Sequence, residues 1–209
     1  MVWIAHHKTQ QKNYMEITYK NRKGDRYYLH EGKTKIGNPK YFFSKKIKGI
    51  LPDKIPDGYE IYENIDAQVF LRKIQPKIIT DDEVNTVKLH LEKCTHIPHW
   101  QVEVKKNTII VYTSDDNEKG IVNECSNVFG GLFSPIKKDL LERALKRNIH
   151  YMPMLKFTLV DKTNRQFDLD RQYFRDECGW MKIDYEKSLD ELAKKYSPYL
   201  NTEKFFELY

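Results

Sequence analysis

The chain has 209 residues, enough to bury one large core or two small ones. Its composition, 40% apolar and 32% charged, argues against a disordered chain, and no apolar run reaches the length that crosses a bilayer. The net charge is +6, and residues 1–50 hold 12 Lys and Arg against 3 Asp and Glu. This asymmetry favours an anionic partner for the N-terminal part, with a merely solvated basic face as the alternative interpretation.

The first part of the chain has the pattern of β structure. The alternating segment Tyr14–Lys20 predicts a strand, and the ring-rich segments RYYLHE and KYFFSK predict a hairpin around a Gly/Asn/Pro loop. The segments GYEIYEN and QVFLRKI predict a second hairpin, joined by the polar turn at 64–67. We therefore expect a small antiparallel sheet over residues 14–74, within a basic β-rich N-terminal unit of residues 1–77.

The remaining residues, 78–209, predict a mixed unit of helices and β-hairpins. Thr80 and Glu83 form a capping-box pattern before apolar residues at helical spacing, which indicates a helix, and Ser188 and Glu191 repeat the pattern later. Further elements are expected at 100–114 (hairpin), 120–129 (helix), from Pro135 (helix), at 154–170 (hairpin) and at 179–185 (strand). Because the strands come in adjacent pairs without intervening helices, the pattern predicts an α+β fold with antiparallel sheets.

Residues 24–46, GDRYYLHEGKTKIGNPKYFFSKK, combine five Tyr and Phe rings with six Lys and Arg. Alternation along a strand places Tyr28 and His30 on one face and Tyr27 and Leu29 on the other, so both faces carry rings. One face must pack on the core. If the other is open, its rings and cations form a stacking platform with phosphate contacts, as in single-strand binding. A basic β-ribbon of this kind also fits a duplex groove.

Eight residues of this stretch are the candidate nucleic-acid-binding residues. They are Arg26, Tyr28, Lys33, Lys35, Lys40, Phe42, Lys45 and Lys46. The loop 32–38 between the strands is expected to be flexible and basic enough to touch a phosphate backbone. The structural alternative is that the rings are cross-strand packing partners and that the lysines protect a sheet edge from pairing with another chain.

Two clusters have the residue types of catalytic or metal sites. Cys94, His96 and His99 in CTHIPHW have zinc-ligand chemistry, but a structural zinc site needs four ligands and no second Cys/His pair follows. Asp168 and Asp170 share a face of an expected strand and suit Mg²⁺ in a hydrolase or nuclease if Lys156 or His150 is brought near them. From the sequence alone we assign no catalytic residue, no metal ligand and no cofactor.

The cysteines indicate the compartment. Cys94, Cys125 and Cys178 are odd in number and widely spaced, which favours a reducing cytoplasm over a disulfide framework. Cys125 has no matching base in the sequence, so a small buried thiol is the expected role. The N-terminal residues contain no long apolar region, so we expect no secretory signal.

Several segments together resemble a family of uncharacterised bacterial proteins. They are RYYLHEGKTKIGNPKYFFSKK, IPDGYEIYEN, QVFLRKI and YMPMLKFTLVD, and the resemblance covers most of the chain. No activity or functional residue follows from this resemblance. It implies a bacterial, cytosolic setting and nothing further.

These observations favour a non-enzymatic binding protein that contacts nucleic acid through the basic aromatic hairpin, with no membrane association. One alternative is a protein-interaction subunit of a larger assembly that docks through the same aromatic face, since Tyr, Phe and Arg are common at interfaces. The other alternative is a metal-dependent hydrolase or nuclease that uses Asp168 and Asp170. Phosphate binding weakens steeply with salt, which separates the first hypothesis from the second.

Overall fold

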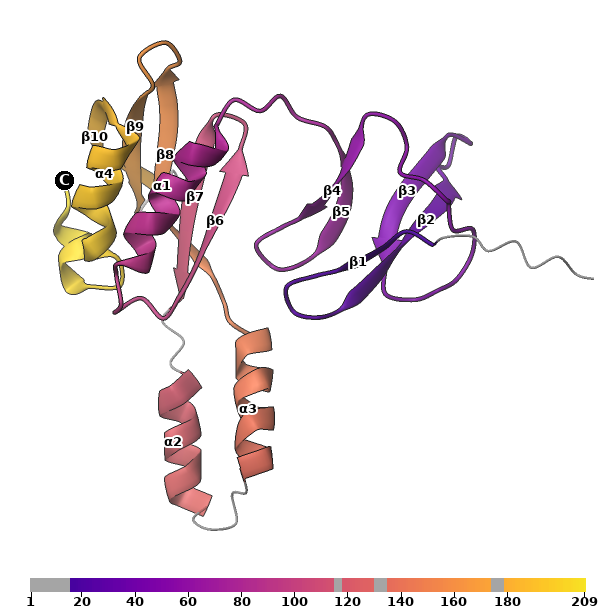
Figure 1. Cartoon of the computed structure of the whole chain (residues 1–209), viewed down its shortest axis with the longest axis horizontal. Helices are drawn as coiled ribbons and strands as arrows, with labels where there is room; N and C mark the ends of the chain where they lie inside the picture. The colour runs from indigo at the N-terminus through magenta and orange to yellow at the C-terminus, as the bar shows by residue number, and fades with distance from the viewer. Residues whose placement is uncertain (1–15, 115–117, 130–134, 174–178) are drawn as a thin grey trace, which may run out of the picture. The chain divides into compact units, whose positions relative to one another are not determined.

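The computed structural model describes residues 16–114, 118–129, 135–173 and 179–209. The chain divides into two compact units, Met1–Ile74 and Gln75–Tyr209. Strands pair only in antiparallel ladders within the described ranges, and helices accompany them in the second unit (Figure 1). The predicted α+β class with antiparallel sheets is confirmed.

The first unit contains a three-stranded sheet and a separate two-stranded hairpin (Figure 1). The strands of the sheet, in the spatial order β1-β2-β3, are β1 (Thr18–Lys20), β2 (Arg26–Lys33) and β3 (Pro39–Ser44). The hairpin pairs β4 (Tyr59–Glu63) with β5 (Val69–Lys73). Each predicted ring-rich segment is therefore a strand, and each pair is joined as the turn residues indicated.

Side chains connect the sheet and the hairpin of the first unit. Tyr19 Oη donates to Glu63 over 3.0 Å, and Asn21 Nδ2 donates to the backbone oxygen of Ala67 over 2.7 Å. Leu29 is buried, as are Ala67 and Val69. The small core of the first unit thus includes Leu29 of β2, and the rings on the same face of the sheet are half-buried.

The second unit is built on a five-stranded antiparallel sheet in the order β10-β9-β8-β7-β6. Its strands are β6 (His99–Lys105), β7 (Thr108–Ser114), β8 (Met152–Asp161), β9 (Gln166–Gln172) and β10 (Trp180–Ser188). Each strand pairs with the strands next to it in chain order. Short turns join β6 to β7 and β8 to β9, whereas residues 115–151 separate β7 from β8. Local signals therefore predicted the β6–β7 and β8–β9 hairpins but not their union into one sheet.

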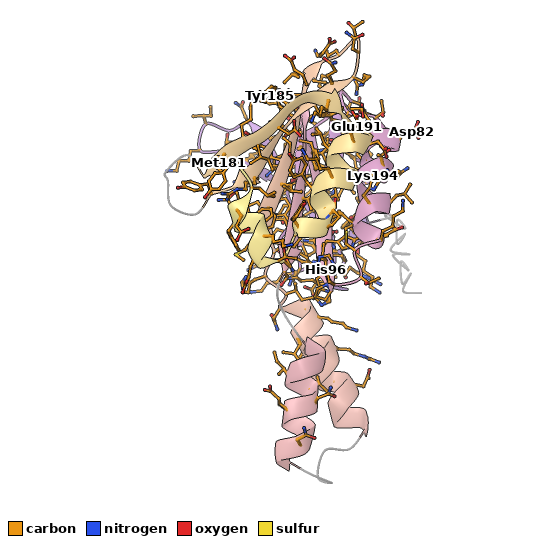
Figure 2. All side chains as sticks on the ribbon, turned by 90° about the vertical axis from the view of Figure 1, so that its left-hand side faces the viewer. Asp82, His96, Met181, Tyr185, Glu191 and Lys194 are labelled. Atoms are coloured by element: carbon orange, nitrogen blue, oxygen red, sulfur yellow. The ribbon has the colours of Figure 1, made fainter. Side chains whose placement is uncertain are left out.

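Two helices cover one face of this sheet: α1 (Asp81–Glu92) and α4 (Leu189–Tyr196) lie side by side in Figure 2. Both begin with the predicted capping boxes, at Thr80 and at Ser188. Apolar side chains of both helices pack into the core with those of the strands, among them Val87, Leu91, Leu192, Phe157 and Leu169. Asp82, Glu191 and Lys194 lie on the exposed side of the helices (Figure 2).

Within the described ranges, the other helical elements are α2 (Glu118–Phe129), α3 (Pro135–Arg147) and two short 3₁₀ turns, Ser197–Tyr199 and Glu203–Glu207. Helices α2 and α3 contact each other and form a helical hairpin (Figure 1). No helix in the described ranges is long and apolar enough to cross a membrane.

Candidate nucleic-acid interface

Strand pairing decides which candidate residues share a face of the β2–β3 hairpin. His30 lies opposite Phe42, and Gly32 lies opposite Lys40. Because directly opposed residues project to the same face, Arg26, Tyr28, Lys40 and Phe42 share one face of the sheet. We call this the Phe42 face. The structure thus brings four of the eight candidate residues together, and the pairing agrees with the alternation expected from the sequence.

The other four candidates lie elsewhere on the hairpin. Lys33 pairs with Pro39 and projects to the opposite face, and Lys35 lies in the turn between the strands. Lys45 and Lys46 follow the end of β3. Arg26 and Lys40 therefore lie on the Phe42 face, whereas Lys33 and Lys35 lie at or near the turn. With Lys45 and Lys46 beyond β3, the candidate cations do not form one flat platform.

Lys45 is already engaged within the first unit. Its Nζ lies 2.8 Å from Asp25 Oδ2 and 5.5 Å from the centre of the Tyr27 ring. An ion pair at a surface adds little stability, but it lowers the local positive charge that a phosphate would meet. Lys45 consequently contributes less to an anion-binding surface than its sequence neighbours do.

The other candidate cations of the hairpin are exposed to solvent. Arg26, Lys33, Lys35, Lys40 and Lys46 are exposed, and in the part of the chain that the structure describes none of them forms an ion pair. Five exposed positive charges without neutralising carboxylates produce a local positive potential that attracts polyanions. This is the electrostatic feature on which a phosphate contact depends.

One exposed ring accompanies these charges. Phe42 is 42% exposed, whereas Tyr28, Tyr41 and Phe43 are half-buried. The Phe42 ring stacks on His30, with ring centres 5.3 Å apart and planes inclined by 14°. A platform for successive stacked bases needs several exposed rings. In the β2–β3 hairpin, which the structure describes in full, Phe42 is the one exposed ring, so the single-strand form of the hypothesis receives less support than the phosphate-contact form.

His30 beneath Phe42 is the feature that sequence reasoning missed. The residue is 2% exposed, and both ring nitrogens are buried without a hydrogen-bond partner among the described residues. A buried polar group that lacks a partner costs about 1–3 kcal/mol of stability. Alternation placed His30 on the same face as Tyr28, but no local signal showed that this part of the face would be covered.

Replacing His30 by leucine, which has a similar volume, is expected to stabilise the first unit by about 1–2 kcal/mol, because the substitution removes the unpaired nitrogens. Hydrogen exchange of the β2 and β3 backbone amides measures this directly, and exchange should become slower in His30→Leu. Faster exchange would show that the imidazole makes a favourable interaction in solution.

The Cys/His cluster has structural roles. The Cys94 thiol donates to the backbone oxygen of His90 over 3.3 Å, and burial raises the pKa of this thiol, which disfavours a metal-binding thiolate. His96 Nε2 lies 3.0 Å from the backbone oxygen of Leu200. Across the described ranges, no group of three or more His, Cys, Asp or Glu side chains is arranged to hold a metal ion. Cys125 is half-buried, and Cys178 lies outside the described residues.

The aspartates of β9 share a sheet face with Lys156, as the hydrolase hypothesis required. Lys182 Nζ donates to Asp168, and this hydrogen bond raises the pKa of Lys182. Asp170 pairs with Lys156 at 3.4 Å. Each carboxylate is thus balanced by its own lysine and is not directed at a shared ion. The metal-dependent hydrolase stays a prediction to which this geometry lends no support.

Comparison of the chain with protein-family models, with curated proteins and with solved structures finds no match. We therefore infer the function of the chain from the residues and contacts of the β2–β3 hairpin.

Proposed function

We propose that the chain is a nucleic-acid-binding protein that contacts phosphates through the cations of the β2–β3 hairpin. The observation that carries this proposal is a group of five exposed cations that form no ion pair with any residue the structure describes: Arg26, Lys33, Lys35, Lys40 and Lys46. When such cations meet a nucleic acid, they neutralise phosphates and release condensed counterions, and this release supplies most of the affinity.

The proposed contacts divide by position. Arg26 and Lys40 project from the face that carries Phe42, so they would approach phosphates that flank an apolar contact with this ring. Lys33 and Lys35 lie at the turn and would contact the backbone there. Phosphate contacts position a protein without reading sequence, so this arrangement supports general rather than base-specific binding. The proposed setting is a reducing bacterial cytoplasm, which suits the free thiols of Cys94 and Cys125.

A protein partner is the second candidate, because the first unit also exposes apolar side chains. Phe42 is 42% exposed, Ile47 59% and Ile50 68%. An interface built on these residues would depend chiefly on apolar burial and would resist salt. Salt dependence therefore separates the two candidates.

Fluorescence anisotropy of the full-length chain with labelled single- and double-stranded oligonucleotides tests the proposal. If three to five phosphates are neutralised, the logarithm of the association constant for duplex should fall with the logarithm of salt concentration with a slope of about −3 to −5. Absence of binding to every oligonucleotide, even at low salt, would contradict the proposal and direct attention to a protein partner.

A further inference from the structure

The turn between β2 and β3 exposes an apolar side chain at its tip. Ile36 lies between Lys35 and Gly37 and is 82% exposed. Single exposed apolar residues are common on protein surfaces, so exposure alone indicates nothing. The hydrogen bonds of the turn and the charges near Ile36 make its exposure informative.

Hydrogen bonds within the turn hold Ile36 in its outward position. The Gly37 amide donates to the Thr34 oxygen over 2.9 Å, and the Thr34 amide donates to the Asn38 oxygen over 2.8 Å. The Asn38 amide also donates to Thr34 Oγ1 over 3.1 Å. Gly37 has a φ of +87°, a conformation that few other residues adopt. These hydrogen bonds define a compact turn that presents Ile36 to solvent, and a turn already held in one conformation loses less entropy on binding.

The tip extends beyond the part of β2 that has neighbours on both edges. β1 pairs with β2 from Arg26 to Tyr28, and Ile50 bridges to Glu31. From Gly32 onward, the described residues place only β3 beside β2. A short two-stranded tip, and not a long free ribbon, is therefore available to enter a groove.

The charges around the tip indicate which kind of partner it fits. Lys33, Lys35 and Lys40 surround the apolar tip, and among the described residues none of them forms an ion pair. An apolar wedge flanked by cations is how proteins enter the DNA minor groove, separate two stacked base pairs and kink the duplex. RNA duplexes have a wide, shallow minor groove and do not match a narrow wedge. A bilayer requires a larger apolar surface than one isoleucine for stable association.

We infer that the tip is a wedge for duplex DNA: Ile36 enters between two base pairs from the minor groove while Lys33, Lys35 and Lys40 hold the flanking phosphates. This inference rests on the proposed function and adds the substrate class and the mode of binding. The wedge favours flexible pyrimidine–purine steps such as TA, because these steps kink at least cost. The lysines supply the affinity, and Ile36 changes the shape of the DNA.

Fluorescence energy transfer between the ends of a short duplex with one central TA step tests the inference. Binding of the full-length chain should bring the ends closer, as a kink of about 20–90° would. Ile36→Ser should still bind with the same salt dependence but without the change in end-to-end distance, and Ile36→Leu should restore it. Ile47→Ser is the matched control, because Ile47 is also exposed and flanked by Lys46 and Lys48 but lies outside the tip.

The outcomes separate this inference from the proposed function. Duplex binding without a kink, or a kink that persists in Ile36→Ser, overturns the wedge and leaves nucleic-acid binding intact. Absence of binding to any nucleic acid overturns both. Binding to vesicles of anionic phospholipid that Ile36→Ser abolishes, with no kink in the duplex, identifies the tip as a membrane contact and also overturns the wedge. Ile36 is exposed, so its variants should fold normally, which circular dichroism checks.

Discussion

Replacing Lys33, Lys35 and Lys40 together by glutamate is expected to lower the affinity for duplex DNA at least about 100-fold at low salt. Three phosphate contacts are lost and three negative charges take their place, so attraction becomes repulsion. The salt dependence should also become shallower by about three in the log–log slope. Anisotropy titrations of both proteins over a series of salt concentrations measure the two effects together.

A second triple substitution in the other unit controls for net charge. Lys106, Lys162 and Lys204 are exposed, and within the described ranges they form no ion pair. Their replacement by glutamate changes the net charge by the same amount but leaves the β2–β3 hairpin unaltered. This control should bind within a few-fold of the original chain. Equal losses in the two triple variants would mean that overall charge, and not the hairpin, determines binding.

The Asp184→Asn variant is expected to destabilise the second unit by about 2 kcal/mol at neutral pH. Asp184 is buried, and its carboxylate accepts hydrogen bonds from Tyr196 Oη (2.9 Å), Lys187 Nζ (3.1 Å) and Lys195 Nζ (3.2 Å). Burial opposes ionisation, but the hydrogen bonds from Lys187, Tyr196 and Lys195 and from the Tyr185 amide outweigh it. They lower the pKa of Asp184 from 3.8 to about 2.

The depressed pKa of Asp184 fixes the direction of the pH dependence. The folded state holds the carboxylate in its ionised form more strongly than the unfolded chain does, so the stabilisation is fully present above a pH of about 4. It is lost as the pH falls from about 4 to about 2, where the carboxylate becomes protonated in the folded state as well. The free-energy difference between the original chain and Asp184→Asn should therefore shrink across this range.

Urea unfolding followed by tryptophan fluorescence measures this effect, because Trp100 and Trp180 both lie in the second unit. Asp139→Asn is a suitable control, since Asp139 lies in α3 and forms an exposed pair with Arg143, which contributes about 0.5 kcal/mol or less. A pH-independent difference between the original chain and Asp184→Asn would contradict the assignment of the low pKa to this network.

Most of the fold could be predicted from the sequence because its signals are local. The capping boxes at Thr80 and Ser188 fix the starts of α1 and α4 within a few residues of chain. The hairpins depend on turns between adjacent strands, and the register of β2 with β3 follows from one turn. The antiparallel α+β class needed no information beyond these neighbouring pairs.

The candidate interface was predictable only in part, because exposure depends on contacts between distant residues. Alternation placed Tyr28 and His30 on one face, but it did not show that Tyr28 would be half-buried or that Phe42 would be exposed. The pairing of Lys45 with Asp25 joins residues twenty positions apart. The burial of His30 without a hydrogen-bond partner likewise has no local signal.

The carboxylates of β9 in the second unit were also predictable only in part, because their partners come from other strands. Asp168 and Asp170 were correctly placed on one face of a strand, but only the structure shows that Lys156 of the neighbouring strand shares this face. The lysine that pairs with Asp168 comes from β10, whose register shifts at irregularities between Lys182 and Lys187. Sequence spacing does not reveal such a shift, and so it did not show that lysines would balance these carboxylates one by one.

Photo-crosslinking of the full-length chain to an oligonucleotide that carries a photoreactive base, with the linked peptides identified by mass spectrometry, tests the central claim most directly. The account predicts crosslinks within residues 26–46, at the β2–β3 hairpin and its tip, and their loss in the triple glutamate variant of Lys33, Lys35 and Lys40. Crosslinks confined to residues 75–209, with none on the hairpin, would contradict it.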